Sequence, residues 1–305
     1  SRTFLARLIQ ANDDVKGYYG AIKNTFFSYK KVKSRISKKC ETFNFGRNKL
    51  AKLDVRGKKV DLYACGNELD NYSKTHTGIG TFCHEFSHVL GLPDLYETTG
   101  YGTHKTMGEW SILDYGPYNN DGNTPPTYSA YERFFMGWLT PRLITEPENI
   151  TLGELRESQK ALLISESDEH NLIGNDPNPT TFYLLENRQQ TGWDEYLPGH
   201  GLMLTKIKYS YNKWYGNTVN NTASSMGVDL IEADGKAPNY NSNGYMGKAK
   251  DLFPAGATAY TQITDHAIEE ITEENGLISF SVAENSSTES RTAVITVTYL
   301  EISKS

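Results

Sequence analysis

The stretch from His84 to Asp94 contains residue types whose spacing suits metal chemistry. It reads H-E-F-S-H-V-L-G-L-P-D. Histidines four residues apart on a helix project from one face, one turn apart, so both imidazoles can reach a single zinc ion. Gly91 can adopt a positive φ and end the helix, which lets Asp94 fold back onto the same ion. Three protein ligands with one open position predict a catalytic zinc site rather than a structural one.

Glu85 directly follows the first histidine and is the predicted general base. Beside the metal, its carboxylate can take a proton from the water that attacks a substrate carbonyl. The sequence thus predicts His84, His88 and Asp94 as metal ligands and one catalytic Zn²⁺ as the cofactor. We expect no covalent acyl-enzyme, because no serine or cysteine stands in a nucleophile arrangement with a base.

The surrounding residues predict the helix that this spacing requires. An apolar stripe recurs at helical intervals, and its members are Ile79, Phe82, Cys83, Phe86, Val89 and Leu90. Thr77 is the predicted N-cap. A second helix is predicted over residues 127–138, ending before Pro141. Within it, Glu132 and Arg133 favour an ion pair or a helix cap over a role in substrate binding.

The character of the chain changes near residue 145. Alternating segments separated by Asn, Gly and Pro turns predict strands, namely Ala161–Ser165, Thr181–Glu186, Gly201–Lys208 and Leu277–Val282. Lys59–Ala64 alternates in the same way ahead of the zinc helix. The predicted fold class is α+β, with a catalytic domain over 1–144 and a β-rich, sandwich-like domain over 145–285. Residues 286–305 are predicted to form a linker and a terminal strand.

Composition excludes several partners. The 305 residues carry a net charge of −6 and no basic stripe, which argues against nucleic acid. No apolar run is long enough for a membrane span. Ser1 is not a natural start, so we expect a processed or trimmed chain.

Three cysteines, Cys40, Cys65 and Cys83, cannot all pair with one another. In an oxidising compartment the preferred disulfide is Cys65–Cys83, because it would tie the incoming strand to the zinc helix. Three buried thiols are an equally good interpretation.

Several segments resemble the immune-inhibitor-A-like family of secreted zinc metallopeptidases, within the metzincin clan. They are Tyr63–Cys65, Gly78–Tyr96, Trp110–Tyr118, Tyr131–Arg133, Gly137–Leu139, Tyr183–Gln189, Gly192–Gly201 and Asp251–Pro254. The resemblance implies a metzincin-like catalytic domain with a β-rich domain after it. It also implies a zinc-dependent endopeptidase that is secreted or at the cell surface, is made with a pro-segment, and acts on proteins or peptides.

The resemblance further implies that Leu113–Gly116 forms a tight turn beneath the metal. The clan normally has methionine where Leu113 stands; that residue supports the site by packing, so leucine should be tolerated. Tyr115 follows two residues later and is the candidate to stabilise the oxyanion, as in some metzincins. A tyrosine packed against the helix is an equally good interpretation.

Other interpretations stay open at this point. A latent or inactive relative could bind host glycan or protein through its β-rich half, although the intact Glu85 argues against it. A zinc amidase acting on non-protein substrates is a third possibility. Residues 119–123 could chelate Ca²⁺, although a plain turn is favoured. His76 and His104 are interpreted as loop histidines, and Trp193 and Trp214 as packing residues rather than a sugar-binding face.

Overall fold

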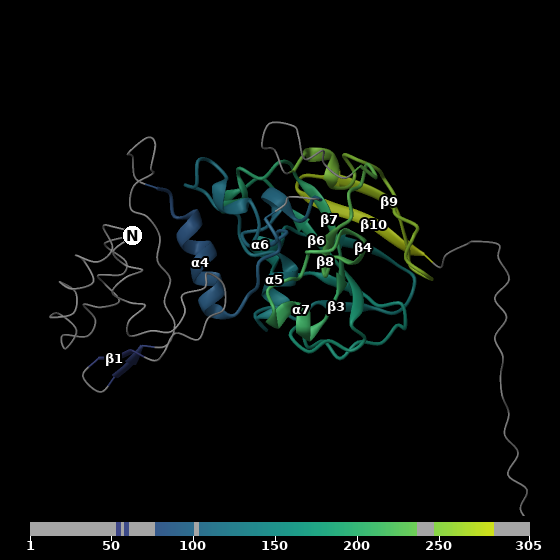
Figure 1. The fold of residues 1–305 in the computed structure, drawn as a ribbon. Helices are drawn as coiled ribbons and strands as arrows, with labels where there is room; N and C mark the ends of the chain where they lie inside the picture. Colours follow the sequence, from purple (N-terminus) through teal and green to yellow (C-terminus); the bar gives the residue numbers. More distant parts are fainter. Residues whose placement is uncertain (1–52, 56–57, 61–76, 101–103, 237–246, 284–305) are drawn as a thin grey trace, which may run out of the picture.

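The computed structural model describes residues 53–55, 58–60, 77–100, 104–236 and 247–283 (Figure 1). Its helices are α4 (Gly80–Leu90), α5 (Ala130–Phe135), α6 (Leu155–Ser158) and α7 (Tyr211–Tyr215), with short 3-10 turns at Gly108–Trp110, Gly116–Tyr118, Gly192–Asp194, Ala223–Ser225 and Ala249–Asp251. Its strands are β1 (Leu53–Val55), β2 (Lys58–Val60), β3 (Arg142–Ile144), β4 (Glu148–Leu152), β5 (Leu162–Ile164), β6 (Thr181–Arg188), β7 (Gly201–Lys208), β8 (Val228–Leu230), β9 (Ala267–Glu274) and β10 (Leu277–Ala283). Predictions on Cys40, Cys65, His76 and residues 286–305 lie outside the described residues.

A five-stranded sheet forms the centre of the described structure, in the order β3-β5-β6-β7-β8. β3 and β5 are parallel, and the other neighbours are antiparallel. Nearly every residue of β6 is buried, so both faces of this sheet are covered. Successive side chains of a strand point to opposite faces, and the alternate residues of β6 therefore enter two different cores. Phe182 and Leu184 join one core, whereas Tyr183 and Leu185 join the other.

The first core lies between the central sheet and the segments that carry the predicted site. It contains Leu92 and Leu113 from one side and Phe182 and Met203 from the other. This core is continuous across residue 144, where the sequence predicts a domain boundary. The boundary itself stays a prediction, but the described residues on its two sides pack as one unit.

The second core lies between the central sheet and a three-stranded antiparallel sheet of order β4-β10-β9. Inward residues of β10, Ile278, Phe280 and Val282, alternate with less buried ones, as expected for a sheet with one covered face. Figure 1 shows this smaller sheet on the side of the molecule away from α4. The described part is therefore a mixed α and β structure built on sheets.

Helix α5 begins at a capping box. Ser129 accepts from the backbone N–H of Glu132, and the Glu132 carboxylate accepts from the Ser129 N–H at 2.6 Å. The helix is shorter than the predicted 127–138, because its N-cap, Ser129, has an extended backbone and Gly137 follows in a left-handed conformation (φ 70°). The predicted capping role of Glu132 is confirmed.

A buried cluster of charges, the Arg188 cluster, joins α5 to the central sheet. We define it as Glu132, Glu186, Arg188 and Asp194, all fully or almost fully buried. Arg188 donates from Nη1 to Glu186 at 3.0 Å and from Nη2 to Asp194 at 2.9 Å. Glu132 accepts at 2.5 Å from Ser111, in the turn next to the predicted site. Arg188 also donates from Nη2 to the carbonyl of Thr127 at 3.3 Å, so one guanidinium connects the sheet to the segment that leads into α5.

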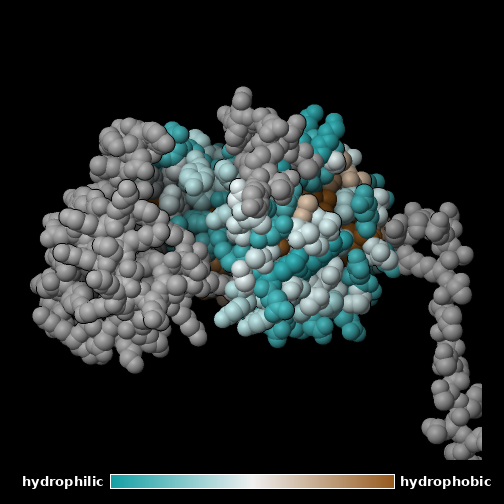
Figure 2. Space-filling model, viewed as in Figure 1, coloured by the Kyte–Doolittle hydropathy of each residue, from teal (hydrophilic) through white to brown (hydrophobic). Residues whose placement is uncertain are grey.

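All four strands predicted after residue 145 are present, as β5, β6, β7 and β10. In the described part no helix is long and apolar enough to cross a membrane. The face in Figure 2 is mostly hydrophilic or neutral, with small apolar patches near β9 and β10.

Candidate metal centre

Helix α4 presents the two histidines as the spacing predicts. It begins at Gly80, with Ile79 at the N-cap position, so the prediction of Thr77 as the cap is wrong. Gly80 lies so close to the Pro117 carbonyl that a Cβ there would overlap it, and its N–H donates to the Gly122 carbonyl at 2.9 Å. This backbone contact, rather than a side-chain cap, fixes where the helix starts. The rings of His84 and His88 meet edge to face, with centroids 4.7 Å apart.

Gly91 turns the chain back toward the histidines. It adopts φ 109°, and its N–H bonds the carbonyls of Ser87 and His88. Asp94 then lies buried beside both rings, with Oδ1 at 3.2 Å from His84 Nε2 and at 3.0 Å from His88 Nε2. The two Nε2 atoms are themselves 3.2 Å apart. The structure thus brings the three predicted ligand atoms together.

Hydrogen bonds on the far side of each ring fix which nitrogen faces the cluster. Nδ1 of His84 lies 2.8 Å from the carbonyl oxygen of Ile112, and Nδ1 of His88 lies 2.8 Å from that of Leu92. A carbonyl oxygen only accepts, so each Nδ1 donates its proton. In a neutral ring this leaves the Nε2 lone pair aimed at the partner ligands.

These donor atoms fit a metal cation. Oδ1 of Asp94 is buried and has no hydrogen-bond partner, which is costly unless a cation neutralises it. Donors on a tetrahedral zinc ion with bonds of about 2.0–2.1 Å stand roughly 3.3 Å apart, close to the 3.0–3.2 Å between these atoms. Two imidazoles and one carboxylate also match the ligand preferences of zinc. No second cluster of this kind occurs among the residues that the structure describes.

The electrostatics of the cluster point the same way. Burial alone would raise the pKa of Asp94, but contacts with His84, His88 and Asn217 lower it more, so the carboxylate is charged. Burial lowers the pKa of His88, but its contact with the negative Asp94 carboxylate outweighs this and raises it overall. The cluster thus favours a positive charge between its members, which a bound metal would supply.

The turn near residue 113 lies against the cluster. The carbonyl of Ile112 accepts from His84, and the carbonyl of Leu113 accepts from the N–H of Leu95 at 2.8 Å. Leu113 itself is fully buried in the first core. Asp114 holds the turn closed through Thr106 and through the N–H of Gly108 at 2.7 Å. A leucine here packs beneath the ligands without contributing a polar atom.

Two residues near the cluster are missed by sequence reasoning. The ring of Tyr96 stacks on His84, with centroids 6.3 Å apart. Burial and the negative charges of Asp94 and Glu85 raise the pKa of Tyr96 well above its usual range, so its phenol stays neutral and can donate. The other is Asn217, which is hydrogen-bonded to Asp94 although the two are more than a hundred residues apart in the sequence. The position of Tyr96 two residues after Asp94 was the available signal for the first; no local signal marks the second.

Tyr115, the predicted oxyanion residue, lies at the end of the turn near residue 113. It is 37% exposed, and its ring packs on Tyr118 with centroids 5.8 Å apart.

Glu85, the predicted general base, is half-buried beside the cluster. Its negative charge contributes to raising the pKa of both Tyr96 and His88.

Other predicted residues have ordinary roles. His104 bonds the carbonyl of Asn220 at 2.6 Å, as a loop histidine, and the Trp214 indole is buried and donates to Tyr131. Cys83 carries a free thiol, and Cys65, its partner in the preferred disulfide, lies outside the described residues, so that pairing stays a prediction. The partly buried side chain of Cys83 packs against the first core, and burial raises the pKa of its thiol.

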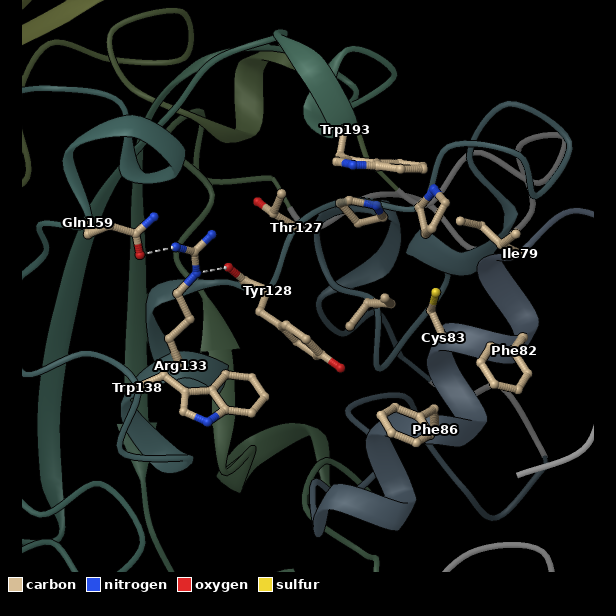
Figure 3. Close-up of a pocket in the computed structure, with 13 residues that line it drawn as sticks. Ile79, Phe82, Cys83, Phe86, Thr127, Tyr128, Arg133, Trp138, Gln159 and Trp193 are labelled. Carbon is tan, nitrogen blue, oxygen red and sulfur yellow. Dashed lines mark hydrogen bonds between the residues drawn. The ribbon is translucent and has the colours of Figure 1, made fainter. Parts of the chain in front are cut away.

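An apolar pocket lies beside α4 (Figure 3). The helix lines it with Ile79, Phe82, Cys83 and Phe86, whose positions on the helical wheel are about 120–180° from the middle of the histidine face. Facing side chains include Trp138 and Trp193, both about half exposed. Four of the six residues of the apolar stripe therefore face this pocket, while the histidines face the turn near residue 113.

Comparison with known proteins finds similarity to metallopeptidases, which agrees with this geometry. Residues 59–139, which include the whole ligand cluster, match the catalytic domain of immune inhibitor A peptidase M6. Pre-pro-metalloprotease PrtV of Vibrio cholerae is 30% identical over 94 residues, which is 30% of this chain and 10% of the relative. A protein of Arthroderma benhamiae, whose name describes a secreted metallopeptidase, is 25% identical over 256 residues, 68% of this chain and 37% of the relative.

The chain is therefore similar to the immune-inhibitor-A-like metallopeptidases over residues 59–139, as its sequence predicts. It spans between a tenth and about 37% of the length of these relatives. No solved structure matches it.

Proposed function

We propose that this protein is a secreted, zinc-dependent endopeptidase that hydrolyses peptide bonds of extracellular proteins. The observation that carries the proposal is the convergence of three acceptor atoms, from His84, His88 and Asp94, at 3.0–3.2 Å with no hydrogen-bond partner for Asp94 Oδ1. We assign these three residues as the metal ligands. The names of the relatives support the peptide substrate, the secretion and a pro-segment, since one is called a pre-pro-metalloprotease and another secreted.

Glu85 is the proposed general base. A zinc ion held by three such ligands supplies Lewis acidity, which activates water and polarises a carbonyl. The Glu85 carboxylate takes the proton of the attacking water and hands it to the departing amine nitrogen. Its place directly after His84 on α4, half-buried beside the cluster, supports this role.

Two tyrosines can donate a hydrogen bond to the oxygen that gains negative charge. We keep Tyr115 as the proposed donor, because it lies exposed at the end of the turn under the cluster. Tyr96 is the competing donor, held against His84. Tyr115→Phe and Tyr96→Phe separate them: loss of one oxyanion donor costs about 10²–10³ in kcat, and the variant that shows this loss identifies the donor.

The fold is part of the proposal. We propose that the segment around α4 and the turn at residue 113 is metzincin-like, and that the sheets after residue 145 correspond to the β-rich domain that the sequence predicts. The packing of the turn beneath the ligands supports the first point, and the sandwich-like contact of the two sheets supports the second.

A mixed peptide library tests the proposal. We expect cleavage that disappears with a zinc chelator and returns with zinc. Glu85→Gln should retain one zinc per chain and lose about two to four orders of magnitude in rate. Near-normal cleavage by that variant would contradict the mechanism, and the absence of any bound metal in the wild type would contradict the site.

The alternatives give different results in the same experiment. A zinc amidase would turn over an acylated small molecule and cleave no extended peptide. A latent protein that binds glycan or protein through its sheets would hold zinc and cleave nothing. The retained Glu85 favours an enzyme over the latent protein, and the names of the relatives favour a peptidase over an amidase.

A further inference from the structure

The loop that carries the third ligand is hydrogen-bonded to a turn rich in asparagine, residues 217–221, which we call the asparagine turn. It connects α7 to β8. Asp94 donates its backbone N–H to Oδ1 of Asn217 at 2.7 Å, and Nδ2 of Asn217 donates to Oδ2 of Asp94. Thr98, four residues on, donates its N–H to Oδ1 of Asn221 at 2.8 Å. The two segments are joined side by side at both ends.

The contact with Asn217 determines how Asp94 faces the histidines. One amide group supplies an acceptor and a donor, and both are used on the same aspartate. Because Oδ2 is held by Asn217, Oδ1 is the oxygen left facing His84 and His88. Asn217 adopts φ 55°, a left-handed conformation that asparagine tolerates better than most residues. The amide thus sets the orientation of a carboxylate whose other oxygen has no hydrogen-bond partner.

The asparagine turn is itself fixed to the central sheet. Asn220 is fully buried, and its Nδ2 donates to the carbonyls of Leu95 and Val228, each at 2.8 Å. Its Oδ1 accepts the N–H groups of Gly227 and Val228, each at 3.0 Å. Val228 begins β8, the edge strand of the five-stranded sheet. The orientation of Asp94 is therefore tied, through the turn, to the part of the chain that follows residue 145.

We propose that Asn217 is a positioning residue of the metal centre, which presents Asp94 Oδ1 to the metal. This inference rests on the proposed function, since it assumes that the cluster binds zinc. Groups that orient a metal ligand in this way typically contribute 10–100-fold to metal affinity. We expect the effect to be confined to the metal centre, because Asn217 lies at the surface end of the turn and the buried Asn220 holds the turn in place.

Asn217→Gly in the full chain tests the proposal, since glycine keeps the left-handed backbone and removes only the amide. Asn221→Ala is the matched control, because it removes a neighbouring side chain that bonds Thr98 and leaves Asp94 untouched. We would measure zinc affinity by competition with a chromophoric chelator, and the absorption of the Co²⁺ form, which reports ligand geometry. Asn217→Gly should bind zinc about 10–100-fold more weakly and alter the cobalt spectrum, while Asn221→Ala changes neither.

Equal zinc affinity and an unchanged cobalt spectrum in Asn217→Gly would overturn the inference while leaving the proposed function standing. An equal loss of affinity in both variants would also overturn it, because the turn would then act only as a scaffold. If the wild-type chain binds no zinc, the proposed function fails first. Metal-free unfolding curves of the two variants, expected to agree with each other, exclude misfolding as the cause of a weaker affinity.

Discussion

Two groups of ionisable side chains in the described part of the molecule differ in how their negative charges are neutralised. In the Arg188 cluster a buried guanidinium pairs with two carboxylates, at 3.0 and 2.9 Å. In the ligand cluster, the ion-pair partners of Asp94 among the described residues are the two histidines, whose other nitrogens donate to backbone carbonyls. The first cluster contains its own cation and the second must acquire one.

This difference separates a structural charge cluster from a functional one. Burial alone would lower the pKa of Arg188, but the charges of Asp194 and Glu186 raise it by more than burial lowers it. The arginine is therefore permanently charged. Both carboxylates paired with Arg188 find their cation within the cluster, and the buried atom left without a hydrogen bond there is Arg188 Nε, a donor that cannot bind a metal cation. The ligand cluster leaves a buried carboxylate oxygen unpaired, which makes it suited to an external cation.

Removing the internal cation is expected to have the largest effect on stability. Arg188→Met leaves Glu186 and Asp194 buried without a positive partner, and breaking a buried pair in this way costs about 3–5 kcal/mol. Denaturant unfolding of the purified variant measures the loss. Arg142→Met is the control, because the Arg142–Glu148 pair is half exposed and such pairs contribute about 0–1 kcal/mol. Similar losses in both variants would remove the distinction between the clusters.

Supplying the external cation is expected to have the next largest effect. Zinc at a hundred times its dissociation constant should raise the free energy of unfolding by about 2.7 kcal/mol. Asp94→Ala should lose most of that increment, while Glu85→Gln should keep it, since Glu85 is not a proposed ligand. Thermal unfolding with and without zinc gives the three values. An increment retained in Asp94→Ala would show that zinc acts elsewhere on the chain.

The two clusters also differ in how far the sequence predicts them. The ligand cluster spans eleven consecutive residues, His84–Asp94, whose helical spacing and glycine turn can be read locally. The Arg188 cluster gathers residues from α5, β6 and the segment after it, so only the folded sheet brings them together. For the same reason Asn217, in the asparagine turn, could not be found from the sequence.

Whether a strand can be predicted from the sequence depends on its length and on its pattern of apolar residues. β6 and β7 have eight residues each and were predicted, β7 with the correct bounds. β3 and β8 have three residues each and lack the continuous apolar run that makes the equally short β5 detectable. β9 was missed because it contains four glutamates and a left-handed residue, Glu270, that interrupts alternation. Its partner β10 alternates regularly and was predicted.

A third group of acids, Glu232, Asp229 and Asp251, makes the stability of the fold depend on pH. Burial and the charges of Asp229 and Asp251 raise the pKa of Glu232 to about 7, against the opposing effect of Lys248. Glu232 therefore binds its proton more tightly in the folded chain than in the unfolded one. Its contribution to stability is fully present below about pH 4.5 and is lost as the pH rises through 7.

Glu232→Gln removes this dependence, because glutamine stays neutral. At pH 8 the variant should be more stable than the wild type by about 1 kcal/mol, a value reduced from the full shift because the group is partly exposed to solvent. At pH 4 the two should agree. Denaturant unfolding at both pH values measures this, with the exposed Glu146→Gln as a control that should change little. A wild type that grows more stable between pH 5 and 8 relative to Glu232→Gln would contradict the sign.

The smallest effect is expected for a substitution at Leu113, which tests whether side-chain packing beneath the ligand cluster matters for zinc binding. Leu113 is fully buried and carries no polar side-chain atom toward the ligands. Leu113→Met conserves volume, so the free energy of unfolding should change by less than about 1.5 kcal/mol. Because the contacts to His84 and Leu95 come from backbone carbonyls of this turn, zinc affinity should stay within about threefold, a shift under 1 kcal/mol. A tenfold change in zinc affinity without loss of stability would mean that the shape of this side chain positions the ligands, and that the turn determines the metal centre through more than its backbone.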